Sequence, residues 1–232
     1  MADLAEAQKK KGYIIVTADK GLAGAYNHNI LKMADEQMKT PGEHFLFVVG
    51  EMGRHYYENK KVPTVAQFHF TAQNPSMHRA RIICDEILEW YRNEDLNEVH
   101  IVYTQMINNL ASTMVIDQLL PLKKADFTQI PAGLMIEVYQ EEVAMVPSVE
   151  ALIENIVPSY ITGYIYGALI ESFCSEQNAR MMTMDSANRN GGEMLRKLSI
   201  QYNRVRQAAI TQEITEVISG AKVLKAKKKK LQ

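Results

Sequence analysis

The chain has 232 residues, of which 47% are hydrophobic and 23% are charged, the composition of an ordinary globular protein. No apolar run approaches the ~20 residues that a membrane-spanning helix needs. The first residues also lack the basic-then-apolar order of a secretory signal, so we expect a cytoplasmic protein without a transmembrane segment. The net charge of −1 is unevenly distributed, because the residues before Glu171 carry −7 and those from Glu171 onward carry +6. This asymmetry indicates an interaction arm for nucleic acid or for an acidic protein surface.

The first two-thirds of the chain alternates between strand-like and helix-like patterns. Short apolar or alternating runs predict strands at Tyr13–Thr17, His44–Val49, Val62–Phe70, Glu98–Met106, Thr113–Leu120 and Leu134–Tyr139. Helical spacing predicts helices at Asn27–Lys39, Glu51–Asn59 and Pro75–Arg92. This order predicts an α/β fold with an open, mostly parallel Rossmann-like sheet, flanking helices and an antiparallel part late in the chain.

A second helical region begins at Pro147 and Ser148, where Ser148 is the predicted N-cap, and Pro158 is expected to interrupt it. From Ser159 the helical pattern leads into Glu171–Leu224, a stretch of 54 residues without proline. At ~1.5 Å per residue such a helix is about 80 Å long, too long to bury its full length against its own domain. We therefore predict an α/β globular domain (1–158), a shaft helix (159–224) and a basic tail (225–232).

The shaft helix carries an apolar seam. Two series of residues step by three and four: Leu195, Leu198, Tyr202, Val205 and Ala209, then Ile210, Ile214, Val217, Ala221 and Leu224. The 3.5-residue period is typical of a coiled coil, and the alternative is a helix packed lengthwise on its own domain. Gly191 and Gly192 each cost about 1 kcal/mol relative to alanine, so they mark a weak point or a close approach of another backbone.

The sequence gives little support for an enzyme, a metal site or a cofactor. The turn Gly21–Gly24 follows a strand and precedes a helix, as a phosphate-binding loop would, but it matches neither nucleotide-binding motif and a tight turn explains it better. The six histidines lack metal-type spacing, and no GxSxG motif occurs. We expect Cys84 and Cys174 to be buried free thiols. The lysine-rich tail lacks interleaved aromatic residues, so a solvated tail is favoured over binding to nucleic acid or lipid.

The long helix contains a series of specific short motifs: Ser175-Glu176-Gln177, Ala179-Arg180-Met181, Tyr202-Asn203, Arg206-Gln207, Ile210-Thr211, Glu213-Ile214 and Ser219-Gly220-Ala221. Further motifs are Gly21–Asn27, Tyr103-Thr104 and Gln118–Leu122. Together these stretches resemble the gamma subunit of F-type ATP synthases, in a form similar to the bacterial one, and the long helix carries most of the resemblance. The family begins with a long basic helix that pairs with the C-terminal one. We expect that helix to be absent here, because the first predicted strand already starts at Tyr13.

The resemblance implies a non-catalytic rotor of a proton-translocating complex, without a cofactor. Its implied partners are the alpha and beta subunits, the epsilon subunit and the c-type ring, at the cytoplasmic face of the cell membrane. The region near Gln140–Val149 is implied to lie in the foot that meets epsilon and the ring. The residues that match those contacting a loop of the beta subunit are Arg206, Gln207, Thr211 and Glu213. The alternative is that they form a solvated face of the helix. The alternatives are a freestanding α/β ligand-binding module and a truncated, non-rotating paralogue.

Overall fold

The computed structural model describes residues 9–108, 111–122 and 149–230. The chain divides into two compact units, Met1–Met181 and Met182–Gln232, and each is described by itself. Unit 1 holds all the strands of the described chain and most of its helices, and unit 2 is the C-terminal part of one helix.

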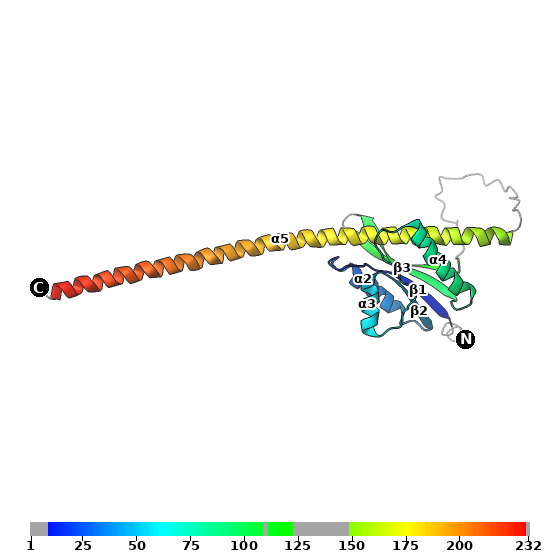
Figure 1. The fold of residues 1–232 in the computed structure, drawn as a ribbon, viewed down its shortest axis with the longest axis horizontal. Helices are drawn as coiled ribbons and strands as arrows, with labels where there is room; N and C mark the ends of the chain where they lie inside the picture. The colour runs from blue at the N-terminus through cyan, green and yellow to red at the C-terminus, as the bar shows by residue number, and fades with distance from the viewer. Residues whose placement is uncertain (1–8, 109–110, 123–148, 231–232) are drawn as a thin grey trace, which may run out of the picture. The chain divides into compact units, whose positions relative to one another are not determined.

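Unit 1 is built on a four-stranded sheet with the order β2-β1-β3-β4 (Figure 1). The strands are β1 (Lys10–Val16), β2 (Glu43–Val49), β3 (Glu98–Asn108) and β4 (Ala111–Leu120). Strand β1 pairs in parallel with β2 and β3, whereas β4 runs antiparallel to β3. The expectation of a mostly parallel α/β sheet with a late antiparallel part is therefore confirmed.

The strand predicted at Val62–Phe70 is wrong. In that segment the described chain has turns, and only Phe70 forms an isolated bridge with Val49. Pro63 cannot donate to a ladder, and the segment meets β2 and its end through isolated backbone bonds, from Val65 N to Leu46 O at 3.0 Å and from Gly50 N to Phe70 O at 2.9 Å. The strand predicted at Leu134–Tyr139 and the N-cap predicted at Ser148 lie outside the described residues.

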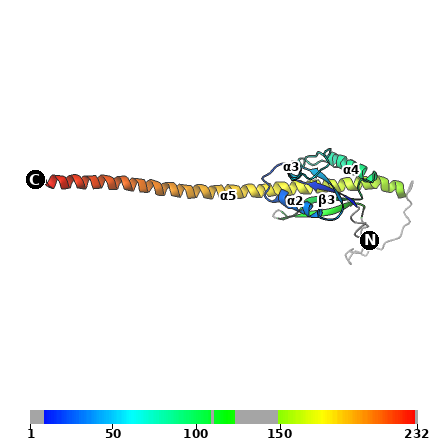
Figure 2. The same ribbon diagram turned by 90° about the horizontal axis from the view of Figure 1, so that it is seen from below.

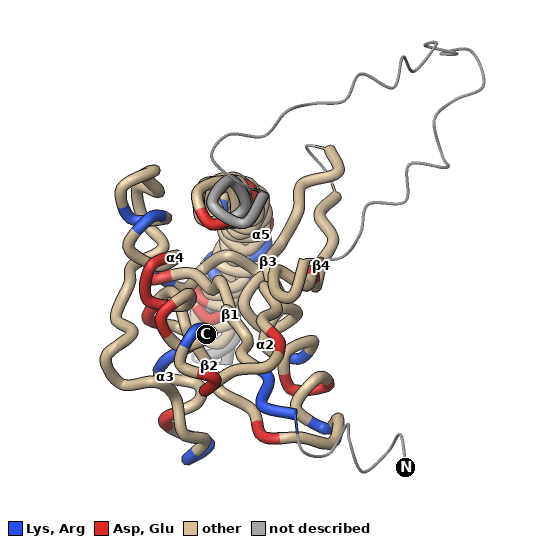
Figure 3. The backbone as a smooth tube through the Cα atoms, turned by 90° about the vertical axis from the view of Figure 1, so that its right-hand side faces the viewer, with Lys and Arg blue, Asp and Glu red and all other residues tan. Residues whose placement is uncertain are grey.

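Both faces of the sheet are covered by helices (Figures 1 and 2). One face packs against α2 (Tyr26–Gln37) and α3 (Glu51–Lys60), through a cluster that includes Ile15, Ile30 and Tyr57. The other face packs against α4 (Met77–Arg92) and the start of α5 (Val149–Lys230), through a larger cluster that includes Ile83 and Ile165. Seen along α5, α4 lies on one side of the helix and β4 on the other (Figure 3).

Helix α5 runs through Pro158 without a break, so the interruption expected there is wrong. Proline removes one helical hydrogen bond, which normally breaks or kinks a helix. Tertiary packing compensates for that loss, because Ile161 and Ile165 on the next turns are fully buried. The Cys84 thiol of α4 also donates a hydrogen bond to the Pro158 carbonyl, with a sulfur–oxygen distance of 3.5 Å.

Unit 2, taken by itself, is a helix whose described side chains from Met184 to Leu224 are all exposed. The helix continues through Gly191 and Gly192, and a Cβ added at either position meets open space among the described atoms. The residues of the predicted seam are exposed as well, for example Leu195, Leu198 and Val217. The coiled coil that their spacing indicates stays a prediction.

Candidate functional site: the seat of α5 on the sheet

The start of α5 lies on the sheet through one narrow stripe of side chains. The stripe consists of Ile161, Ile165, Ala168, Ser172, Ser175 and Ala179, which step by four and three. The first five are buried and Ala179 is half-buried. A 3.5-residue step keeps one side of a helix facing one surface, so this single face holds α5 against unit 1. The stripe is apolar at Ile161, Ile165 and Ala168, polar at Ser172 and Ser175, and apolar again at Ala179.

The polar part of the stripe meets the end of β3. Ser172 Oγ accepts a hydrogen bond from Thr104 N at 3.2 Å, and Ser175 Oγ donates to Thr104 O at 3.4 Å. A third side chain, Glu171, accepts from Met106 N through Oε2 at 2.9 Å. Buried backbone groups must find partners, and here helix side chains provide them.

Farther along α5, Arg180 joins the helix to the loop that follows β1. Its Nη2 donates to the carbonyls of Lys20 at 3.2 Å and Gly21 at 3.3 Å, and to Glu176 Oε1 at 2.6 Å. Glu176 is only 2% exposed, and burial raises the pKa of its carboxyl, whereas Arg180 lowers that pKa and Asp19 raises it. We call Glu171, Ser172, Ser175, Glu176 and Arg180 the polar seat.

Tyrosine hydroxyls reinforce the attachment from two sides. Tyr26 at the start of α2 is buried beside Ser172, and its burial raises the pKa of the phenol. On β4, the Asp117 carboxylate accepts hydrogen bonds from Tyr164 of α5 and from Tyr103 of β3. One carboxylate thus links α5 to two neighbouring strands.

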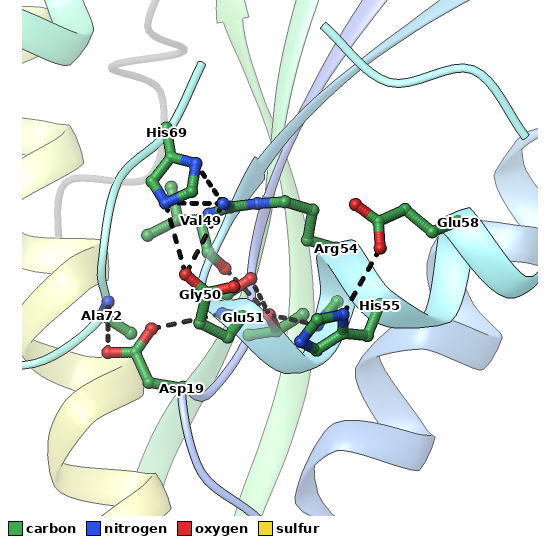
Figure 4. A network of polar contacts seen from close by, with 11 residues as sticks. Asp19, Val49, Gly50, Glu51, Arg54, His55, Glu58, His69 and Ala72 are labelled. Atoms are coloured by element: carbon green, nitrogen blue, oxygen red, sulfur yellow. Dashed lines mark hydrogen bonds and ion pairs between the residues drawn. The ribbon is translucent and has the colours of Figure 1, made fainter. Parts of the chain in front are cut away.

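Asp19, directly after β1, holds the neighbouring loops (Figure 4). Its carboxylate accepts from Glu51 N at 3.2 Å, and from Ala72 N and Gln73 N at 3.0 Å each. Beside it, Glu51 forms an ion pair with Arg54 at 3.5 Å, and its Oε1 lies 3.3 Å from His69 Nε2. The backbone N–H groups at this end of the sheet are therefore engaged by a side chain of the protein itself.

This arrangement occupies the place where a doubly wound sheet binds its ligand. Ligands bind there outside the carboxyl ends of the strands, where the strand order reverses, which in this sheet is between β1 and β3. The buried Ser172, Ser175 and Glu176 fill that position. A carboxylate at Asp19 would also repel a phosphate, so the Gly21–Gly24 segment serves as a tight turn, with positive φ at Leu22 and Gly24. The geometry suits a mechanical attachment and disfavours the ligand-binding module.

Comparison with known proteins identifies the family. A family model described as ATP synthase matches residues 1–224. The ATP synthase gamma chain of Ruminiclostridium cellulolyticum is 42% identical over 217 residues, which cover 93% of this chain and 74% of that protein. That of Acetivibrio thermocellus is 40% identical over 225 residues, covering 95% and 75%. The chain belongs to the ATP synthase gamma-chain family. A further relative, from Acetobacterium woodii, is named sodium ion specific and is 35% identical over 227 residues, covering 93% and 75%.

Solved structures of ATP synthases contain chains of similar fold. A chain of the Euglena gracilis mitochondrial ATP synthase in rotational state 3 aligns with a TM-score of 0.70 at 17% identity, covering 98% of this chain and 77% of that one. A chain of the Tetrahymena thermophila mitochondrial ATP synthase, from its central stalk and c-ring, aligns with a TM-score of 0.59 at 21% identity, covering 78% and 77%.

Family membership confirms the role expected from the sequence. A gamma chain is a non-catalytic rotor component of the central stalk, in the peripheral F1 part of ATP synthase. The expected rotor function and the expected lack of a catalytic role of its own are therefore both supported. In the described part of the chain, no helix is both long and apolar enough to cross a membrane.

The four residues predicted to contact the beta subunit all lie in unit 2. Arg206, Gln207, Thr211 and Glu213 are exposed there on α5. Thr211 Oγ1 donates to the Gln207 carbonyl at 2.8 Å, a local bond that orients the hydroxyl along the helix. These four residues lie on one helical segment, which follows the polar seat in the sequence.

The polar seat of this gamma chain was not singled out as a site by sequence reasoning. The motifs that resemble the family include Ser175, Glu176 and Arg180, but no structural role for these residues followed from the sequence. One signal was available, because Ser172 and Ser175 continue the spacing of Ile161 and Ile165 and so had to be buried. The expectation that both cysteines are buried is wrong for Cys174, which is exposed because it lies off this stripe. Cys84 is buried, and burial raises the pKa of its thiol.

Proposed function

We propose that this gamma chain is the rotor of a proton-translocating F-type ATP synthase at the cytoplasmic face of the cell membrane. Its partners in this proposal are the alpha and beta subunits around unit 2, and the epsilon subunit and c-type ring at the foot. Of the region near Gln140–Val149, proposed for the foot, residues 140–148 lie outside the described residues and Val149 begins α5. The domain division into 1–158, 159–224 and 225–232 belongs to the same proposal.

One observation supports this proposal most strongly. A single helix, α5, carries both the polar seat on the sheet and the exposed segment with Arg206 and Glu213. A force applied to side chains of that segment therefore acts on the same hydrogen-bonded element that Ser172 and Arg180 attach to unit 1. A subunit that transmits rotation needs such an element, whereas a subunit that binds a small ligand does not.

The proposed contact with a beta-subunit loop rests on charge and spacing. Arg206 and Glu213 are seven residues apart, so they lie on the same side of the helix two turns from each other. Neither forms an ion pair with another residue in the described part of the chain. A guanidinium binds acidic loop residues through two parallel charge-assisted hydrogen bonds, which are stronger than neutral ones.

The contact can be tested by assembling alpha, beta and this chain into a complex and measuring affinity and ATP hydrolysis. Removing a charge-assisted bond costs about 1.5–3 kcal/mol, so Arg206→Ala should weaken assembly by roughly ten- to hundredfold. Arg204→Ala is the matched control, because Arg204 is equally exposed but points to another side of the helix. Equal effects of the two substitutions would refute the assignment of Arg206. Gln207→Ala and Glu213→Ala, with Gln212→Ala and Glu216→Ala as controls, extend the test.

The membrane partners call for a separate experiment. An affinity tag after Gln232 should recover alpha, beta, epsilon and the c-type ring from native membranes. Vesicles carrying the complex should acidify on addition of ATP, and a sodium ionophore should leave that signal intact. Acidification that depends on sodium would refute the proposed coupling ion. Recovery of no other subunit would refute the rotor assignment for this chain.

A further inference from the structure

Strand β3 is longer than its parallel neighbour on one side. The ladder between β1 and β3 ends at the pair Ile15–Val102, although β3 continues to Asn108. On the other side, β4 pairs with β3 along nearly its whole length. Among the described residues, the backbone groups of Thr104 and Met106 that face away from β4 therefore have no strand to bond to.

Side chains of α5 take the place of the missing strand. Thr104 N and O are bonded to Ser172 and Ser175, and Met106 N is bonded to Glu171. Ser172 and Ser175 are each 2% exposed, so these bonds are shielded from water. The helix is in effect hydrogen-bonded into the sheet, and not merely packed on it.

These hydrogen bonds restrain the rotation of α5 about its own axis, a motion that the apolar residues of the stripe restrain poorly. Apolar packing is non-directional, so a small rotation of α5 about its own axis loses contact area only gradually. Hydrogen bonds weaken steeply with angle. Successive helix residues are 100° apart around the axis, so a rotation that moves Ser172 away from Thr104 also moves Ser175 and Glu171 from their partners.

We propose that Glu171, Ser172 and Ser175 are positioning residues that fix the rotational register of α5 on the sheet. They prevent the helix from turning against unit 1 when torque is applied. This inference rests on the proposed rotor function. The three side chains determine how much rotation is transmitted. They do not determine whether the chain folds or whether the beta sites hydrolyse ATP.

The test uses the complete complex in membrane vesicles, with ATP hydrolysis and ATP-driven proton uptake measured on the same preparation. In Ser172→Ala/Ser175→Ala we expect at least a threefold fall in protons taken up per ATP hydrolysed, with the hydrolysis rate within twofold of wild type. Cys174→Ala is the matched control on the same turn, since Cys174 is exposed, and should leave the ratio unchanged. An unchanged ratio in an assembled double variant would overturn the proposal.

Glu171 gives a second, independent test, because its half-exposed side chain can be changed with little effect on folding. Glu171→Gln keeps an acceptor oxygen for Met106 N and should retain the wild-type ratio. Glu171→Ala removes that oxygen and should lower the ratio by about half or more. Equal ratios for Gln and Ala would contradict the proposal even if the double serine variant did not assemble. Failure of the proposed function would look different, because the wild-type chain would then support no proton uptake at all.

Discussion

Removing the Arg180 side chain should destabilise unit 1 chiefly by leaving a buried charge unpaired. Arg180 is the ion-pair partner of Glu176, with 2.6 Å between Nη2 and Oε1. The Glu176 side chain is 3% exposed and that of Arg180 is 22% exposed. In Arg180→Ala, the Glu176 carboxylate loses its counter-charge, and the carbonyls of Lys20 and Gly21 lose a donor.

The expected loss can be estimated from the burial of the pair. Breaking a buried ion pair by removing one partner costs about 3–5 kcal/mol. Because Arg180 is partly exposed, water replaces some of its bonds, and we expect about 2–4 kcal/mol. For a unit of this size that corresponds to a fall in Tm of roughly 5–15 °C. Trp90, the only tryptophan of the chain, lies in α4, so its fluorescence reports the unfolding of unit 1.

The stability loss caused by Arg180→Ala should depend on pH, and the direction of that dependence follows from the pKa of Glu176. Burial already raises the pKa of Glu176 above 4.5, and Arg180 is the group that lowers it, so Arg180→Ala should raise that pKa further. A carboxyl whose pKa is higher in the folded state binds more protons there, so stability falls as the pH rises between the unfolded and folded values. The difference in free energy of unfolding between wild type and Arg180→Ala should be largest at neutral pH and should shrink as the pH falls toward 4.5.

Glu176→Gln is the decisive companion substitution, because it removes the charge and keeps the shape of the side chain. Arg180→Ala/Glu176→Gln should recover about 1–2 kcal/mol relative to Arg180→Ala at pH 7, and should lose the pH dependence of this site. If the double variant is no more stable than Arg180→Ala at pH 7, an unpaired charge is not the cause. The polar seat would then stabilise unit 1 through its neutral hydrogen bonds alone.

Three further substitutions test the packing of the two units, each by thermal unfolding. Gly50→Ala should cost about 2–4 kcal/mol, since φ is +95° and the new Cβ would lie 2.3 Å from Thr17 O; an unchanged Tm would show that this turn is not constrained as described. Ile165→Ala should cost about 2–5 kcal/mol through the cavity it leaves in the core, and a loss below 1 kcal/mol would contradict tight packing of α5. Gly191→Ala should raise the helicity and stability of unit 2, by about 0.5–1 kcal/mol, because a Cβ added here would meet none of the described atoms; a decrease in circular dichroism at 222 nm would refute that.

The sequence predicted the elements wherever local pattern and tertiary structure agree. The run His44–Val49 ends at Gly50, and the structure has β2 at Glu43–Val49 with Gly50 at a positive φ. The predictions failed where long-range contacts decide. Val62–Phe70 has strand-like composition, yet its few isolated backbone bonds near β2 do not form a ladder. At Pro158 the local rule predicts a break, but burial of the following turns keeps the helix intact.

The polar seat was harder to predict because most of its partners are backbone atoms. Arg180 donates to carbonyls that are 159 and 160 residues away, and a carbonyl carries no sequence signal of its own. The need for Ser172 and Ser175 arises from the unequal lengths of β1 and β3, which the strand patterns do not resolve. The contact residues Arg206 and Glu213 came from resemblance to the family, and their contact stays a proposal.

Both the stripe and the seam of α5 have a 3.5-residue period, and together they show what this period does and does not specify. The stripe from Ile161 to Ala179 keeps this period over about five turns and lies on a sheet, so the period alone does not indicate a helical partner. The chemistry of the residues adds the missing information. A sheet edge presents unpaired backbone groups, and the stripe meets them with serine hydroxyls. The seam from Leu195 to Ala209 offers only apolar and tyrosine side chains. It therefore suits a surface whose backbone is already hydrogen-bonded internally, which is the surface of another helix.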